Sequence, residues 1–270
     1  MKQSTKRGIE MAQLTIALAQ IDIAFGQPEK NFQTVANAVA EAAQQGAEVV
    51  VLPEMWNTGY DLEHLATTAD PDGLRTKAFL SALAQQYHLA IVGGSVAAAE
   101  NGHFYNRSLT VDHHGRQLAN YDKVHRFRLM NEEKFITAGA TADHFTLGVP
   151  ASVAICYDLR FPEWFRRMAS DGSQLFFLPA EWPTPRLPQF NALLAARAIE
   201  NQAYVVAVNR VGNDPNNAFG GQSQVVDPFG ERLLKLDDQP QVGIVTIDLD
   251  RIAAARQQIP VFTDRRPELY

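Results

Sequence analysis

Short runs of consecutive apolar residues recur along the chain, and several of them are rich in β-branched side chains. Apolar runs of this length are typical of strands that are buried on both faces of a sheet. We therefore expect buried strands at residues 15–19, 49–52, 90–92, 152–156, 175–178 and 204–208.

Helical patterns lie between these runs. In residues 31–45 the apolar side chains return at three- and four-residue steps, which is typical of a helix with one face toward a core. Gly46 follows at once, where a C-cap glycine would end that helix. Further helices are expected at residues 74–87, 163–170 and 190–201.

The middle and the end of the chain carry antiparallel signals. Asn-Gly and His-Gly turn pairs flank an extended segment at residues 105–112, and a turn at residues 227–230 separates two short strands. A last strand is expected at residues 242–247. Two βαβ-like halves of this kind predict an α/β fold with two packed sheets and helices outside. No linker divides the chain, so we expect a single domain over residues 11–270 and a flexible extension at residues 1–10.

Composition excludes several classes of protein. With 46% hydrophobic and 20% charged residues, the chain is neither disordered nor fibrous. A net charge of −6 argues against a broad nucleic-acid-binding surface. No stretch approaches the roughly 20 apolar residues of a membrane helix, and no signal-peptide cleavage pattern is present. The one cysteine, Cys156, excludes an intramolecular disulfide and favours a cytoplasmic protein.

Reactive side chains follow three of the expected strands. Glu54 comes after the strand at residues 49–52, Lys123 after a strand-like segment at residues 117–121, and Cys156 at the end of another strand. Taken singly, each has an ordinary structural explanation as a helix-start acid, a solvated cation or a buried thiol. Ligand sites in α/β sheets lie beyond the carboxyl ends of strands. Because Glu54, Lys123 and Cys156 all follow strands, we expect their side chains to share one pocket.

A carboxylate, an ammonium and a thiol can together carry out acyl transfer. A thiol with its usual pKa of about 8.5 needs a base or a cation to become a nucleophile. The carboxylate can take its proton and return it to a leaving amine. The ammonium can stabilise the oxyanion, a contribution of roughly 3 kcal/mol. The expected reaction proceeds through a thioester and needs no cofactor. The seven histidines show no ligand spacing, so no metal is expected.

Three sequence blocks carry a resemblance to a known family. The segments LPEMWNTGY (52–60), YDKVHRF (121–127) and ICYDLRFPEWFR (155–166) resemble, in the same order, the signature blocks of the nitrilase superfamily of carbon–nitrogen hydrolases. The likeness extends from about Leu14 to the carboxyl terminus. It implies a four-layer αββα sandwich whose subunits pair as a homodimer.

The resemblance also implies roles for individual residues. The family's general base, oxyanion-stabilising cation and nucleophile fall on Glu54, Lys123 and Cys156. The main-chain N–H of Tyr157 would be the other oxyanion donor. A second catalytic glutamate falls on Glu132, and a shift of one residue would make it Glu133 instead.

Residues 175–212 resemble the bacterial ω-amidase branch, whose members hydrolyse 2-oxoglutaramate and related ω-monoamides of dicarboxylic acids. Such a small-molecule substrate carries a carboxylate at its far end, and a guanidinium suits that group. Arg160 and Arg186 are the candidates, although Arg160 could instead pair with Asp158 or Glu54. The expected apolar walls are Tyr60, Phe127, Phe161 and Trp182.

Two other interpretations stay open at this point. Within enzymes, the substrate could be deaminated glutathione or an N-carbamyl compound. From another class, the chain could be a catalytically idle scaffold that binds acyl groups. The presence of Glu54, Lys123 and Cys156 together argues against a scaffold, and an acyl adduct on the cysteine would distinguish the two.

Overall fold

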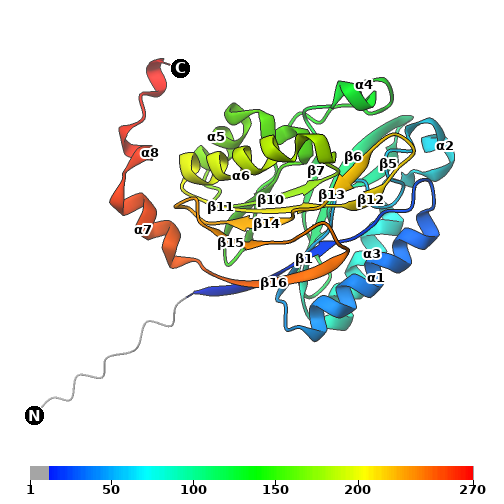
Figure 1. Ribbon diagram of the computed structural model, residues 1–270, viewed down its shortest axis with the longest axis horizontal. Helices are drawn as coiled ribbons and strands as arrows, with labels where there is room; N and C mark the ends of the chain where they lie inside the picture. Colours follow the sequence, from blue (N-terminus) through cyan, green and yellow to red (C-terminus); the bar gives the residue numbers. More distant parts are fainter. Residues whose placement is uncertain (1–11, 270) are drawn as a thin grey trace, which may run out of the picture.

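The computed structural model of the protein describes residues 12–269, and the extension expected at residues 1–10 lies outside them. Two large β-sheets pack face to face within this range. Helices α1 (Pro28–Gln44) and α3 (Leu74–Tyr87) cover one outer face, and α5 (Pro162–Ser170) and α6 (Leu187–Asn201) cover the other (Figure 1). The predicted α/β class and the four-layer αββα sandwich are confirmed.

The first sheet joins the N-terminal half of the chain to the last strand. Its strands are, in spatial order, β16 (Gln241–Asp248), β1 (Gln13–Gln20), β2 (Val49–Val51), β4 (Ala90–Val92), β6 (His103–Val111), β5 (Val96–Glu100) and β3 (Asp70–Pro71), with β7 (Gln117–Asp122) also paired to β6. β1 pairs antiparallel with β16 along its whole length and parallel with β2. The carboxyl-terminal strand therefore ties the two halves of the chain together.

The second sheet comes from the C-terminal half. Its strands are, in spatial order, β15 (Arg232–Lys235), β14 (Gln224–Val226), β11 (Tyr204–Asn209), β10 (Leu175–Ala180), β9 (Val149–Val153) and β8 (Phe145–Leu147). Strands β9, β10 and β11 run parallel, and β14 and β15 form the antiparallel edge. A small hairpin of β12 (Val211–Asn213) and β13 (Ala218–Gly220) follows β11.

Strand β1 shows how the pleat separates the layers. Ile16 and Leu18 belong to the hydrophobic cluster shared with the second sheet, whereas Ala17 and Ala19 belong to the cluster beneath α1 and α3. Alternate side chains of a strand point to opposite faces. A strand in the middle of four layers must therefore be apolar at every position, as the sequence pattern indicated.

Shorter elements complete the chain. They are the α-helical turns α2 (Leu65–Thr68), α4 (Glu132–Phe135), α7 (Asp250–Gln258) and α8 (Val261–Asp264), and the 3-10 turns η1 (Leu62–His64), η2 (Arg128–Met130), η3 (Cys156–Arg160), η4 (Thr184–Arg186) and η5 (Pro267–Leu269). Helix α7 packs against the sandwich through the buried Ile252 and Ala255, and the chain beyond α7 leads away from the two sheets (Figure 1). Among the described residues, no helix has the length and apolar character to cross a membrane.

Candidate active site

The side chains of Glu54, Lys123 and Cys156 meet inside the molecule. Glu54 follows β2, Lys123 follows β7, and Cys156 opens η3 just after β9. Lys123 Nζ lies 2.8 Å from Glu54 Oε1, and the Cys156 thiol is near enough to the same carboxylate for each of the two groups to shift the pKa of the other. The glutamate and lysine side chains are fully buried, and the cysteine is 5% exposed. The structure thus brings together the three residues that the strand ends pointed to.

The loop that carries Glu54 is fixed by the turn after β4. Met55 N donates a hydrogen bond to Ser95 Oγ over 2.9 Å. Gly94 adopts a φ of 60°, and a Cβ atom there would lie 2.0 Å from the carbonyl oxygen of Pro53. Only glycine lets these two segments of the chain approach each other this closely. The turn at Gly94 therefore holds the loop that carries Glu54 in one position.

The Glu54 carboxylate accepts hydrogen bonds at both of its oxygens. Oε1 accepts from Lys123 Nζ, from the Tyr60 hydroxyl at 2.6 Å and from Asn106 Nδ2 at 2.8 Å. Oε2 accepts from the main-chain N–H of Glu181 at 2.8 Å. A carboxylate oxygen can accept more than one hydrogen bond. Oε2, which accepts only one from these groups, can therefore also accept the proton of the thiol.

Of the two candidate second glutamates, Glu132 is the one that contacts Lys123. Its Oε2 lies 2.7 Å from Lys123 Nζ and accepts the Phe127 N–H at 2.7 Å. Its Oε1 accepts from Asn106 Nδ2 at 3.0 Å. Asn106 therefore bridges the two carboxylates that hold the lysine. Glu133 is half-buried and lines a neighbouring pocket.

Burial and neighbouring charge set the protonation states in this cluster. Burial alone would raise the pKa of Glu54, but the charge of Lys123 and the hydrogen bonds from Lys123 and Tyr60 outweigh it and leave the pKa below its usual value. Burial, followed by the negative charge of Glu54, raises the pKa of the Cys156 thiol well above its usual value. A neutral thiol therefore faces an ionised carboxylate that can accept its proton.

Cys156 occupies a sharp turn. Its φ of 45° lies in the left-handed region, which is uncommon for a residue with a side chain and recurs at functional sites. The residue is the first of the 3-10 turn η3. Main-chain N–H groups in the first turn of a helix have no partner within it, so the N–H of Tyr157 is available to a ligand of the same pocket.

The Asp158 carboxylate fastens this turn to the segment that carries Lys123. Its Oδ2 accepts the Ile155 N–H at 2.8 Å and the Tyr121 hydroxyl at 2.6 Å, and its Oδ1 accepts the His125 N–H at 3.0 Å. Tyr121 and His125 stand two residues on either side of the lysine. One buried carboxylate thus connects the cysteine turn with the lysine strand.

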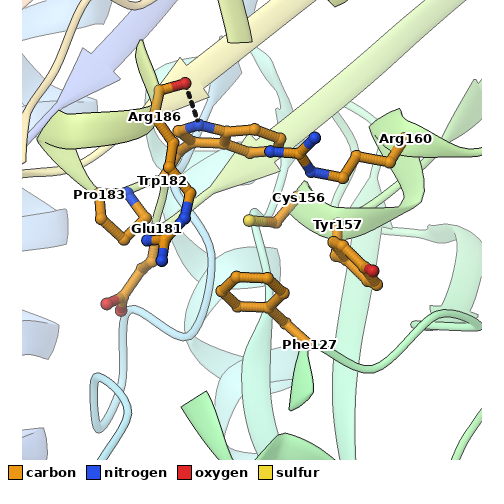
Figure 2. A pocket seen from close by; sticks show the side chains of 8 residues that line it. All are labelled: Phe127, Cys156, Tyr157, Arg160, Glu181, Trp182, Pro183 and Arg186. Atoms are coloured by element: carbon orange, nitrogen blue, oxygen red, sulfur yellow. Dashed lines mark hydrogen bonds between the residues drawn. The ribbon is translucent and has the colours of Figure 1, made fainter. Parts of the chain in front are cut away.

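A pocket opens at the Cys156 sulfur (Figure 2). It is lined by Phe127, Cys156, Tyr157, Arg160, Glu181, Trp182, Pro183 and Arg186. The Arg160 guanidinium lies 5.0 Å from the ring centre of Trp182, and that of Arg186 lies 5.6 Å from the ring centre of Phe127. Trp182 is fixed by a 2.7 Å hydrogen bond from Nε1 to the carbonyl oxygen of Arg186. Two cations thus lie against aromatic walls beside the sulfur.

Two of the residues predicted as pocket walls lie elsewhere, and one predicted ion pair is absent. Tyr60 is not part of this lining, and its hydroxyl instead contacts Glu54 and Lys123. Phe161 is not part of it either, and its ring instead stacks on that of His125, with 3.6 Å between the ring centres. The pair considered between Arg160 and Asp158 or Glu54 does not form among the described residues. Asp158 is engaged by main-chain and aromatic donors, which leaves the arginine facing the pocket.

Sequence reasoning missed Asn106 and Glu181. Asn106 lies inside β6, and nothing in its local pattern indicates which partner its side chain meets. Glu181 directly follows β10, so the same strand-end rule that selected Glu54 could have found it. Within residues 12–269, no three His, Cys, Asp or Glu side chains are grouped so as to hold a metal ion.

The chain belongs to the carbon–nitrogen hydrolase family, whose sequence pattern it matches over residues 15–257. It is 42% identical over 257 residues to the 2-oxoglutaramate amidase of Bacillus subtilis (strain 168), a match that covers 95% of this chain and 99% of that protein.

Two solved structures share the fold. XC1258 from Xanthomonas campestris, a CN-hydrolase superfamily protein with an arsenic adduct in its active site, superposes with a TM-score of 0.87 at 32% identity and covers 94% of this chain and 97% of its own. A mutant amidase from Nesterenkonia sp. AN1 superposes with a TM-score of 0.83 at 27% identity, with 95% of each chain covered. That amidase carries an acetamide moiety covalently added at its active-site cysteine.

Proposed function

We propose that this protein is an amidase that hydrolyses the terminal C–N bond of a small ω-monoamide of a dicarboxylic acid, such as 2-oxoglutaramate. The reaction passes through a thioester on Cys156. The observation that carries the proposal is the buried contact between the Cys156 thiol and Glu54, whose carboxylate is held by Lys123. The activity named for the Bacillus relative supports the substrate class.

In the first half of the reaction, the Cys156 sulfur attacks the amide carbon of the substrate. As the S–C bond forms, Glu54 takes the thiol proton and the carbonyl electrons move onto the oxygen. Because the raised pKa keeps the thiol protonated in the free site, Glu54 must take its proton before or during the attack.

Two donors serve the oxyanion: the free N–H of Tyr157 and the ammonium of Lys123. In the free enzyme, the three N–H groups of Lys123 contact Glu54, Glu132 and, at 3.1 Å, the Tyr60 hydroxyl. The hydroxyl is the only neutral acceptor of the three and the most distant. When the oxyanion forms, Lys123 therefore donates to it in place of the Tyr60 hydroxyl. Tyr60 thus accepts this N–H of Lys123 only while no substrate is bound.

Collapse of the tetrahedral intermediate breaks the C–N bond. Glu54 gives its proton to the nitrogen, ammonia leaves, and the acyl group stays on Cys156 as a thioester. Water then adds to the thioester carbon while Glu54 takes one of its protons. The C–S bond breaks, the proton returns from Glu54 to the sulfur, and the product leaves as a carboxylic acid that loses its remaining proton to water. Glu132 contributes by holding Lys123 in place.

The distal carboxylate of the substrate binds Arg160 and Arg186. Both guanidinium groups line the pocket, and neither forms an ion pair within residues 12–269. Arginine is suited to carboxylates because its planar fork donates two parallel hydrogen bonds.

Ammonia release from a panel of amides tests the substrate class. The expected order places 2-oxoglutaramate and glutaramate above deaminated glutathione and N-carbamyl amino acids in kcat/KM. Cys156→Ser should abolish release while the unfolding curve and the oligomeric state stay unchanged. Faster turnover of deaminated glutathione would reassign the substrate. Absence of both ammonia and any acyl adduct would identify an idle acyl-binding scaffold.

We further propose that residues 11–270 form one domain whose copies pair as a homodimer. Large apolar side chains are exposed on α6 and on the extended carboxyl-terminal segment, namely Ile199, Ile259 and Leu269. Burying such side chains against a second copy would be favourable. Sedimentation equilibrium tests this pairing. A nucleophilic thiol also works best where it stays reduced, which supports a cytoplasmic location.

A further inference from the structure

The side chain of Glu181 lies in the wall of the pocket, and the proposed mechanism does not use it. It lines the same pocket as Cys156 and is 1% exposed (Figure 2). Its Oε2 lies 3.2 Å from Arg210 Nη1, whereas its Oε1 has no hydrogen-bond partner in the part of the chain that the structure describes. Buried carboxyl oxygens are rarely left without a partner, so this one points to a ligand.

We propose that Glu181 is a specificity-determining residue whose Oε1 donates a hydrogen bond to the 2-oxo oxygen of the substrate. The inference rests on the proposed function, because it requires an ω-monoamide with its amide carbon at Cys156 and its carboxylate at the arginines. The oxo group is on the carbon next to that carboxylate, so it is placed toward the arginine end of the pocket, which Glu181 lines together with Arg160 and Arg186. The interaction selects 2-oxo acids over plain dicarboxylic monoamides.

Charge balance explains why Glu181 can act as a donor. Glu54, Glu132 and Glu181 are buried together with two cations, Lys123 and Arg210. The three acids outnumber the cations by one, so the cluster is neutral when it holds one proton. Burial raises the pKa of Glu132 as well as that of Glu181. Glu132, however, accepts three hydrogen bonds and Glu54 accepts four, whereas Glu181 Oε1 accepts none from the described residues. These hydrogen bonds favour the ionised forms of Glu54 and Glu132, so the proton is assigned to Glu181.

The groups that face Glu181 come from several elements. Arg210 follows β11, Glu54 follows β2 and accepts the Glu181 N–H, and Asp214 follows β12. Asp22 lies on the far side of Arg210, at 2.9 Å from its other nitrogen, and is 58% exposed. Burial raises the pKa of Glu181 to about 8, the charge of Arg210 opposes this rise, and the charge of Glu54 adds to it.

The test compares KM for 2-oxoglutaramate and for glutaramate, which lacks the oxo group, between pH 6.5 and 9.5. For the wild type, KM for 2-oxoglutaramate should rise about tenfold per pH unit above pH 8, while KM for glutaramate should not follow it. Glu181→Gln keeps an N–H donor, so it should retain the preference for the oxo acid without this pH dependence. Glu181→Met should lose the preference, by about tenfold.

Several controls keep the result decisive. Any change of 2-oxoglutaramate itself with pH affects wild type and Glu181→Gln equally, so it does not alter the difference in KM between the two enzymes. If Glu181→Met does not fold, the wild type and Glu181→Gln still give the answer. Equal loss with both substrates in Glu181→Gln would overturn the inference, because that pattern identifies a carboxylate that only supports Arg210. Absence of ammonia from either substrate with the wild type would instead contradict the proposed function.

Discussion

Replacing Lys123 with methionine removes the cation that holds two buried carboxylates together. Lys123 Nζ lies 2.8 Å from Glu54 and 2.7 Å from Glu132, and all three side chains are fully buried. Methionine has similar length but no charge. Removing one partner of a buried ion pair costs about 3–5 kcal/mol in the free energy of unfolding, because the remaining charge is left uncompensated. We therefore expect Lys123→Met to lose about 4 kcal/mol.

The second carboxylate provides an internal check of this reasoning. In Lys123→Met, Glu54 and Glu132 share only the bridging Asn106, so one of them must take up a proton. Adding Glu132→Gln removes that conflict. The double variant should therefore be about 2 kcal/mol more stable than Lys123→Met alone. Both variants should lack amidase activity, because the oxyanion has lost its ammonium.

Urea unfolding followed by tryptophan fluorescence measures both free energies by linear extrapolation. Lys235→Met, a change at an exposed lysine of β15, is the matched control and should stay within about 0.5 kcal/mol of the wild type. A loss below about 1 kcal/mol for Lys123→Met would refute the reasoning. So would a double variant in which the two losses simply add, because the carboxylates would then not interact through the lysine.

Three further predictions follow from the site. Asp158→Asn should slow turnover at least about tenfold and slow alkylation of Cys156 by iodoacetamide, because a donor replaces an acceptor of the turn; unchanged alkylation would contradict this. Arg160→Met and Arg186→Met should each raise KM for ω-monoamides about tenfold or more and leave KM for an uncharged amide unchanged; an equal effect on both substrates would exclude carboxylate binding. Because the pKa of Glu181 is raised to about 8 on folding, its carboxyl keeps a proton that the unfolded chain has lost, so the contribution of Glu181 to stability falls as pH rises from about 4.5 to 8. Glu181→Gln should weaken that fall in urea unfolding curves, and identical slopes would contradict the assignment.

The regular elements could be predicted because their patterns are local. The helix at residues 74–87 has the predicted bounds. Helix α1 begins earlier than its apolar pattern, at Pro28, since proline is favoured in a first helical turn. The strand expected at residues 152–156 ends at Val153, because Cys156 turns into η3. Strand β5 was missed because its alanine-rich segment lacks the β-branched side chains that indicate a strand.

Without the family resemblance, which supplied Glu132, the catalytic residues could be predicted only where a reactive side chain coincides with a strand end. Glu54, Lys123 and Cys156 follow strands, so topology alone brings them to one region. Asn106 lies within a strand, and its contact with two carboxylates depends on the packing of the loops around it. The partners of Asp158 could not be predicted either. Sequence spacing suggested Arg160, but the folded chain places the Tyr121 hydroxyl and the His125 N–H against this carboxylate instead.

The central claim is that the Cys156 sulfur forms a covalent acyl intermediate with the help of Glu54. Its most direct test is intact-mass spectrometry with peptide mapping on enzyme quenched in acid during turnover of 2-oxoglutaramate. The account predicts a mass increase equal to the acyl group, located on the peptide that contains Cys156 and absent from Cys156→Ala. Turnover with no adduct on the wild type, or undiminished turnover by Cys156→Ala, would contradict it.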